Sequence, residues 1–192
     1  MKIFGCKERN KVLVDGEIPS EGEVHFKSDG CNLIIHSGVK LHGVNIVFHA
    51  PNASLEIGED SVIRGQIHLG AEDTSVSIGS RLRCNSNIFI NLAEKGDSLR
   101  IGNDCLFANV RFRTSDSHQI FDVETMERLN PSGNIIVEDK VWIAEDVLVL
   151  KNTHIKSNSV VGEKSLVNST LAANSLSAGI PAKVRRSNII WR

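Results

Sequence analysis

The chain has no tyrosine, and aromatic residues of any kind make up only 5% of its 192 residues. Proteins that bind single-stranded nucleic acid commonly stack bases on exposed aromatic side chains within a basic surface. The net charge of −1 argues neither for nor against such a partner, but no aromatic RNA-binding motif is present. We therefore expect no nucleic-acid partner.

Long hydrophobic runs are also missing. A membrane-spanning helix needs about 18 or more consecutive apolar residues, and no such stretch occurs. The first ten residues, MKIFGCKERN, lack the apolar core of a secretory signal. The sequence therefore predicts a cytoplasmic protein without a transmembrane segment.

Cysteine is scarce and scattered. No two of the four cysteines have the spacing of a zinc-binding or redox pair: Cys6, Cys31, Cys84 and Cys105. In a reducing compartment such residues are usually free, buried thiols. His118 also has no second histidine within its own segment, so a zinc site built from several histidines is not predicted. We expect no metal.

What the sequence does contain is a six-residue rhythm. Every sixth residue of one segment is aliphatic: Val137, Ile143, Val149, Ile155, Val161 and Val167. A helix would favour spacings of three and four, and a long strand would alternate by two. A strict period of six predicts instead a short strand and a turn, repeated, with the aliphatic residue pointing inward.

A related unit recurs upstream at a longer interval. It begins at Ile35, Ile57, Ile78, Ile101, Val137 and Ile155, and the steps are 22, 21, 23, 36 and 18 residues. Three hexapeptides make one turn of a triangular β-solenoid, so steps near 21 are one turn with a bulged corner. The long step contains an inserted loop at about 113–134. This pattern predicts an all-β stack of parallel coils that is stable only as a whole.

The ends of the chain have a weaker rhythm. Residues 1–30 contain two short strand-like segments with glycine-centred turns, and we expect them to cap the solenoid. The solenoid itself is expected over 31–171, and a loop and tail over 172–192.

Three stretches resemble the hexapeptide-repeat acyltransferases. VWIAEDVLVLKNTHIKSNSVVGEKSLV is similar to the repeats of that family, and SAGIPAKVRR is similar to its AGNPAKVIR ending. SDSHQIFDVETMERLNPSGNIIVEDKVWI resembles the loop and following coil of sugar and capsular-polysaccharide O-acetyltransferases. The resemblance spans roughly residues 30–190 and implies a left-handed parallel β-helix. Ala144, the GEKS turn and Ile180 depart from the family pattern at positions that bear on cofactor contacts.

Acetyl transfer from a thioester to a hydroxyl needs a base, oxyanion stabilisation and a positioned acceptor. A neutral imidazole is the natural base near pH 7. By resemblance His118 occupies the catalytic-base position; taken alone, it would equally suit a solvated loop. Asp116 either orients the imidazole or caps the turn of the loop.

Two further residues carry roles that the resemblance implies. Trp142 lines the active site in that family, where an indole suits the pantetheine arm and the thioester. Packing between subunits is the alternative for Trp142, and both roles can hold. Asn91 resembles an acceptor-binding asparagine, and capping a solenoid corner is its alternative.

The cofactor is expected along the last part of the chain. No acidic residue follows Glu163, whereas five cations do: Lys164, Lys183, Arg185, Arg186 and Arg192. Such a rim suits the phosphates of coenzyme A, although on charge alone it would equally be a solvated basic tail. By resemblance, Lys183 and Arg185 contact acetyl-CoA, and backbone amides at Ala144, Gly162 and Ser165 contact its pantetheine arm.

These features favour an acetyl-CoA-dependent O-acetyltransferase acting on a saccharide of capsule, lipopolysaccharide or a related glycan. The resemblance also implies a homotrimer with active sites between subunits. Apolar residues of the inserted loop, Phe121, Met126 and Leu129, favour packing of the loop on a neighbour. The alternatives are an N-acyltransferase for a nucleotide-linked amino sugar and a non-catalytic β-helix assembly protein.

Overall fold

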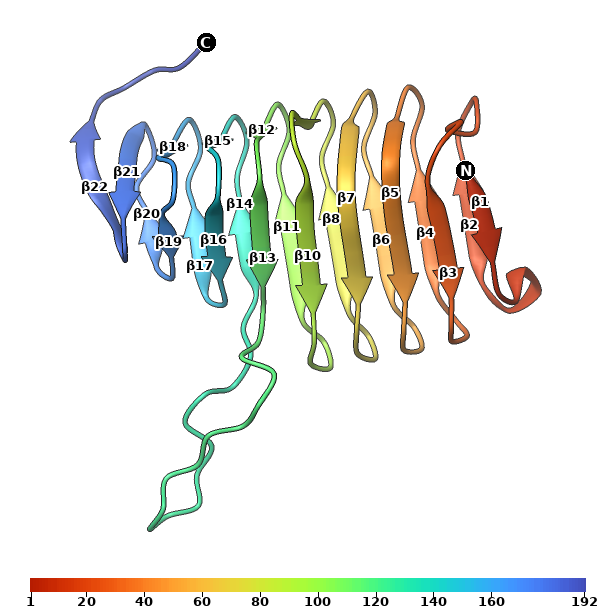
Figure 1. Cartoon of the computed structure of the whole chain (residues 1–192), viewed down its shortest axis with the longest axis horizontal. Helices are drawn as coiled ribbons and strands as arrows, with labels where there is room; N and C mark the ends of the chain where they lie inside the picture. Colours follow the sequence, from red (N-terminus) through yellow and green to blue (C-terminus); the bar gives the residue numbers. More distant parts are fainter.

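The computed structural model describes residues 1–192, apart from the side chain of Lys7. The chain is a parallel β-solenoid of about eight coils, and its strands form three faces. Figure 1 shows the coils stacked side by side along the long axis of the molecule. A short 3-10 helix, η1 (Lys7–Arg9), interrupts the first coil.

Face 1 is an eight-stranded sheet. Its strands are β2 (Lys11–Val14), β4 (Asn32–Ile35), β6 (Ser54–Ile57), β8 (Ser75–Ile78), β11 (Ser98–Ile101), β14 (Ile135–Val137), β17 (Thr153–Ile155) and β20 (Thr170–Leu171).

Faces 2 and 3 belong to one 14-stranded sheet. Face 2 contains β9 (Arg83–Cys84), β12 (Leu106–Phe107), β15 (Trp142–Ile143), β18 (Val160–Val161), β21 (Ser175–Gly179) and β22 (Ala182–Ser187). Face 3 contains β1 (Lys2–Phe4), β3 (Glu23–Phe26), β10 (Ile88–Leu92), β13 (Val110–Arg113), β16 (Val147–Leu150) and β19 (Leu166–Val167). The long strands β5 (Lys40–Phe48) and β7 (Val62–Leu69) run across both faces and join them.

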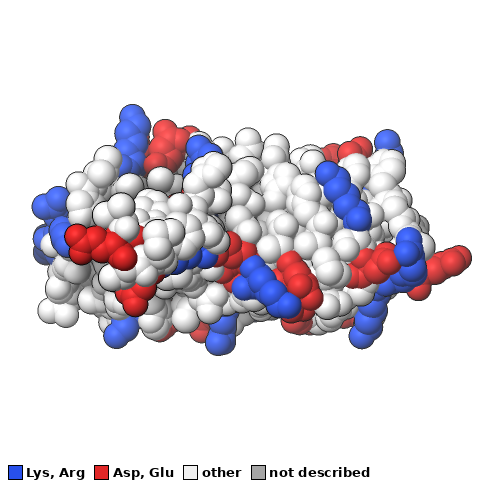
Figure 2. All heavy atoms as spheres, turned by 90° about the horizontal axis from the view of Figure 1, so that it is seen from below, with Lys and Arg blue, Asp and Glu red and all other residues white. Residues whose placement is uncertain are grey.

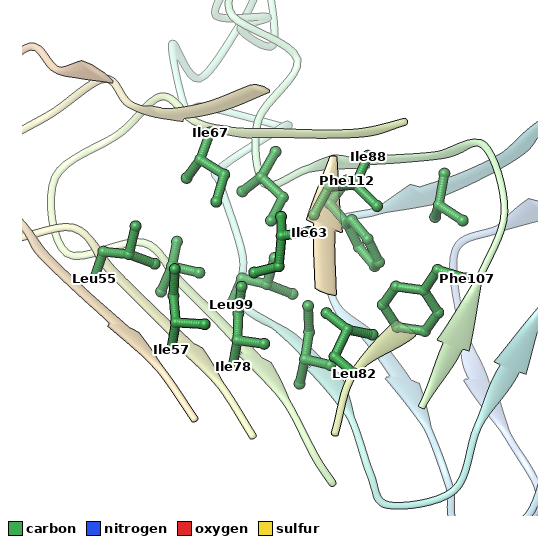
Figure 3. Packing of buried hydrophobic residues seen from close by; sticks show 14 of the residues in the cluster. Leu55, Ile57, Ile63, Ile67, Ile78, Leu82, Ile88, Leu99, Phe107 and Phe112 are labelled. Atoms are coloured by element: carbon green, nitrogen blue, oxygen red, sulfur yellow. The ribbon is translucent and has the colours of Figure 1, made fainter. Parts of the chain in front are cut away.

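The register of face 1 confirms the long-period prediction. One uninterrupted ladder joins the six residues that define the repeat: Ile35, Ile57, Ile78, Ile101, Val137 and Ile155. All six are buried, and so are the aliphatic residues of the six-residue rhythm. Figure 3 shows how one coil fills the interior, because Leu55, Ile63 and Ile67 point inward from its three faces. The apolar core therefore runs the length of the solenoid.

The corners between faces 1 and 2 explain the polar turns of the sequence. One residue at each successive corner has a left-handed backbone with φ between 51° and 60°: Asp60, Arg81, Asp104, Lys140, Asn158 and Asn174. Asp and Asn tolerate this conformation better than most residues do. The backbone N–H of each donates to the preceding corner, for example from Lys140 to Asn103 over 2.8 Å. The corners thus form a ladder of their own.

The parallel ladders continue to both ends of the chain. β1 pairs with β3 and β2 pairs with β4, so no break in pairing falls at residue 30. At the other end β22 folds back antiparallel on β21 and covers the last coil. β22 thereby becomes the edge strand of this sheet at the C-terminal end.

The inserted loop leaves the solenoid between β13 and β14, at the edge where face 3 meets face 1 (Figure 1). It projects as a narrow hairpin, in which Leu129 N donates to Ile120 O and Asp122 N donates to Glu127 O. The large apolar side chains along it are exposed: Ile120, Phe121, Val123, Met126 and Leu129.

Figure 2, which views the molecule from this edge, shows acidic and basic side chains interspersed along the surface. All four cysteines are free; three are buried as expected, whereas Cys6 is half-buried. No helix among the described residues has the length and hydropathy that crossing a membrane requires.

Candidate active site

His118 and Trp142 lie at opposite edges of one chain. His118 is on the inserted loop, between faces 3 and 1, whereas Trp142 begins β15 beside the edge between faces 1 and 2 (Figure 1). The residues predicted from the sequence therefore separate into two groups. We call them the loop half-site, which contains His118, and the face 2 half-site, which contains Trp142.

An ion pair fixes the base of the loop half-site. Both terminal nitrogens of Arg128 donate to the carboxylate of Glu94, each over 2.6 Å. The hydroxyl of Ser115 also donates to Glu94, over 2.5 Å. The guanidinium and the hydroxyl together lower the pKa of Glu94 to about 2. The hairpin is thereby held to the coil that contains β10.

Asp116 faces Lys151 and Asn130. Its carboxylate accepts from Lys151 Nζ over 2.6 Å and from Asn130 Nδ2 over 2.9 Å, and both contacts lower its pKa. Asn130 also donates to the backbone carbonyl of His118 over 2.8 Å. Asp116 thus acts on the loop backbone around His118, through Asn130, while the His118 side chain is exposed.

Asn91 lies on face 3 at the foot of the loop. It pairs with Arg113 in the ladder between β10 and β13, and Arg113 Nη2 donates to Ser117 Oγ over 3.1 Å. Arg111 and Arg113 line a neighbouring surface hollow of about 400 Å³ together with Leu148. The sequence reasoning missed Arg113, although strand alternation places it facing outward immediately before the loop.

The face 2 half-site is a smooth strip of small residues. Ala108, Ala144, Gly162 and Ala178 follow one another along the ladder, and Ala178 pairs with Lys183 on β22. A Cβ atom on Gly162 would lie 2.9 Å from the Cβ of Ala178, so a larger residue at that position would crowd the strip. The outer row beside it contains Leu106, Trp142, Val160 and Leu176.

Two of the three backbone amides proposed as cofactor contacts donate to the neighbouring coil. Ala144 N donates to Val161 O over 3.0 Å, and Gly162 N donates to Ser177 O over 2.8 Å. Ser165 is 2% exposed, and its hydroxyl donates to Gly162 O over 2.6 Å. In this structure these residues shape the strip, while the exposed donors beside it belong to Lys183 and Arg185.

Trp191 contacts Trp142, and the sequence did not predict this contact. Its ring centroid lies 6.2 Å from that of Trp142, with the planes tilted by 49°. The indole Nε1 of Trp191 donates to Lys140 O over 2.9 Å. No spacing rule links positions 142 and 191. The one sequence feature that could have suggested the contact is that these are the only two tryptophans in the chain.

The residues of the strip present methyl groups and glycine, none of which can ligate a metal, and the cations Lys183 and Arg185 stand at one end of it. No group of three or more His, Cys, Asp or Glu side chains gathers among the described residues in a way that would hold a metal ion.

Known proteins provide an independent comparison. The chain is 32% identical over 138 residues to a polysialic acid O-acetyltransferase of Escherichia coli O1:K1 / APEC, which covers 71% of this chain and 44% of the relative. It is 33% identical over 121 residues to the polysialic acid O-acetyltransferase of Neisseria meningitidis, covering 62% and 55%. The chain therefore spans about half the length of these two relatives. No protein-family model matches the chain.

Among solved structures, the crystal structure of the polySia specific acetyltransferase NeuO superposes with a TM-score of 0.87 and 31% sequence identity. That match covers 95% of this chain and 78% of NeuO. The fold predicted from the sequence is thus confirmed, left-handed coils included. The chain belongs to the hexapeptide-repeat acetyltransferases with a left-handed parallel β-helix, the family that includes the polysialic acid O-acetyltransferases.

Proposed function

We propose that this protein is an acetyl-CoA-dependent O-acetyltransferase whose acceptor is a hydroxyl of a saccharide in capsule, lipopolysaccharide or a related glycan. The observation that carries the proposal is the match to an acetyltransferase along nearly the whole chain. The names of the relatives, polysialic acid O-acetyltransferases, favour a polymeric acceptor.

We further propose that each active site combines the loop half-site of one copy with the face 2 half-site of another, in a homotrimer. The separation of His118 from Trp142 within one chain supports this arrangement. So do the exposed apolar side chains of the hairpin, because a projecting row of such residues is typical of an interface. A cyclic assembly would repeat the same contact at every boundary.

In this proposal His118 takes the proton from the acceptor hydroxyl as its oxygen attacks the thioester carbonyl. A C–O bond forms, and the carbonyl electrons move onto oxygen to give a tetrahedral oxyanion. When the C–S bond breaks, the imidazolium returns its proton to the departing thiolate. Asn91, at the foot of the same loop, would hold a neighbouring hydroxyl of the acceptor.

On face 2, Trp142 would form a wall beside the thioester, and the strip through Ala144 and Gly162 would accommodate the pantetheine arm. Lys183 and Arg185 would meet the phosphates of coenzyme A. The order of side chains along face 2 supports this assignment. The aromatic Trp142 comes first, the small residues of the strip follow, and the cations of β22 come last.

The test is an acetyl-transfer assay with acetyl-CoA against polysialic acid, other capsular and lipopolysaccharide glycans, and nucleotide-linked amino sugars. We expect mass spectrometry to show that acetyl groups are added to one of the glycans. The His118→Ala protein is the folded control, which should not transfer acetyl groups efficiently. Transfer to the amine of a nucleotide-linked sugar would favour the N-acyltransferase instead. Failure to acetylate any acceptor would contradict the proposal.

A further inference from the structure

The segment after β22 returns along the solenoid. Asn188 has φ of 59°, which turns the chain, and Figure 1 shows the following residues running back above the neighbouring coils. Ile189 N donates to Asn174 O over 3.0 Å, and Trp191 Nε1 donates to Lys140 O over 2.9 Å. We call residues 188–192 the strap.

The two anchors of the strap are two coils apart. Asn174 and Lys140 both belong to the corner ladder between faces 1 and 2, and the corner of Asn158 lies between them. The strap therefore crosses the coil that contains β18. It does so beside the outer row of face 2, because that row begins directly after these corners.

The burial of Val160 agrees with this path. Val160 pairs with Trp142 on one side and Leu176 on the other, so its side chain points outward. It is nevertheless only 7% exposed, as expected if the strap covers it. Trp142, one coil further, is 39% exposed and meets the ring of Trp191.

We propose that Trp191 is a positioning residue, which holds the indole of Trp142 in place as a wall of the acyl-thioester groove. This inference rests on the function proposed above. Trp191 is itself fixed by the hydrogen bond to Lys140 O, and a tilted ring pair at 6.2 Å lies within the favourable range for aromatic contacts. The strap thus bounds one side of the small-residue strip, and the ligand that it confines is a pantetheine thioester.

The location of the pair argues against a purely structural role. Both rings lie outside the solenoid, where the ladders and the apolar core do not depend on them. Loss of the ring contact should therefore change the binding of the thioester more than the stability of the fold.

The chain has two tryptophans and no tyrosine, so its intrinsic fluorescence reports on this pair alone. We expect acetyl-CoA to change the emission of the native protein. Trp191→Ala should raise the KM for acetyl-CoA by about three- to tenfold, the size expected for one aromatic pair. Trp191→Phe should restore most of the loss, because it keeps a ring. Ile190→Ala is the matched control, since that strap side chain is 68% exposed.

The outcomes separate this inference from the proposed function. Wild-type KM and an unchanged melting temperature in Trp191→Ala would overturn the role of Trp191, even if the native protein acetylates a glycan. A raised KM that Trp191→Phe does not reverse would also count against it. If Trp191→Ala fails to fold, the fluorescence titration of the native protein decides, and an emission that acetyl-CoA leaves unchanged would overturn the role of Trp191. Absence of any transfer by the native protein would sink the proposed function, whereas the fluorescence titration would still test the strap.

Discussion

Glu94 and Arg128 form a bidentate ion pair, with both N···O distances at 2.6 Å, across the base of the inserted loop. The two residues are 34 positions apart. The pair joins the coil containing β10 to the returning arm of the hairpin. It therefore links the solenoid to the segment on which the orientation of His118 depends.

Arg128→Lys should loosen the hairpin, because an ammonium cannot make two parallel bonds to one carboxylate. We expect faster proteolytic cleavage within residues 115–132 and a fall in turnover of about ten- to a hundredfold from misplacement of the base. Arg81→Lys is the matched control, since the Arg81–Asp104 pair is also bidentate but lies on an exposed corner away from the inserted loop. If both substitutions changed cleavage and turnover equally, the Glu94–Arg128 ion pair would have no specific role in positioning the loop.

The same pair predicts a specific acid titration. The pKa of Glu94 is lowered from its ordinary value of 4.5 to about 2 in the folded protein. Its contribution to stability is therefore complete above pH 4.5 and is lost as the pH falls from 4.5 toward 2. An NMR titration of the Glu94 carboxyl carbon should have its midpoint near the lower value, and Arg128→Ala should move the midpoint up. A midpoint at the ordinary value in the native protein would contradict the ion pair.

Asp116 should behave as a partner of Lys151. We expect Asp116→Asn and Lys151→Met to reduce turnover by similar amounts of about tenfold or less, and the double variant to add little, because one contact is lost in each case. The pH dependence of turnover should keep its shape. A much larger loss in Asp116→Asn alone, with an altered pH profile, would instead indicate that Asp116 orients the imidazole.

The bend of β7 at Gly65 makes a prediction about stability. Gly65 has φ of 111°, and a Cβ there would lie 2.0 Å from Ile88 O. Gly65→Ala should therefore destabilise the fold by about 2–4 kcal/mol, from strain and overlap together. Gly43→Ala is the control, because Gly43 has φ of 63° and nothing within 4 Å of the added atom, so about 1 kcal/mol is expected. Urea unfolding of both variants measures the difference, and equal losses would refute the steric argument.

The sequence could predict the parts of this structure that repeat. The ladder from Ile35 to Ile155 follows from spacing alone, because every coil must place an aliphatic residue inward at the same point. The presence of an insertion followed from the step lengths between the repeats, because one step is much longer than the others. Periodicity did not reveal that β1 and β2 join the ladders, since the first coil has a poorer rhythm and gains its register from its neighbour.

The contacts of the candidate site were harder to predict for a physical reason. Glu94–Arg128, Asp116–Lys151 and Trp142–Trp191 each join residues that no repeat relates. They depend on where a non-repeating loop and strap return to the solenoid. The amides of Ala144 and Gly162 illustrate the converse, because regular pairing commits them to the ladder.

The most direct test of the account is a complementation measurement. His118→Ala and Trp142→Ala chains, each with a different affinity tag, are co-expressed, and oligomers that contain both are purified. Alone, His118→Ala should lose turnover by about 10²–10⁴-fold. Mixed trimers should regain about a third of native acetyl transfer, because a ring that contains both chains places an intact His118 against an intact Trp142 at one of its three boundaries. Mixed oligomers that stay as inactive as their parents, although folded and assembled, would contradict an active site shared between copies.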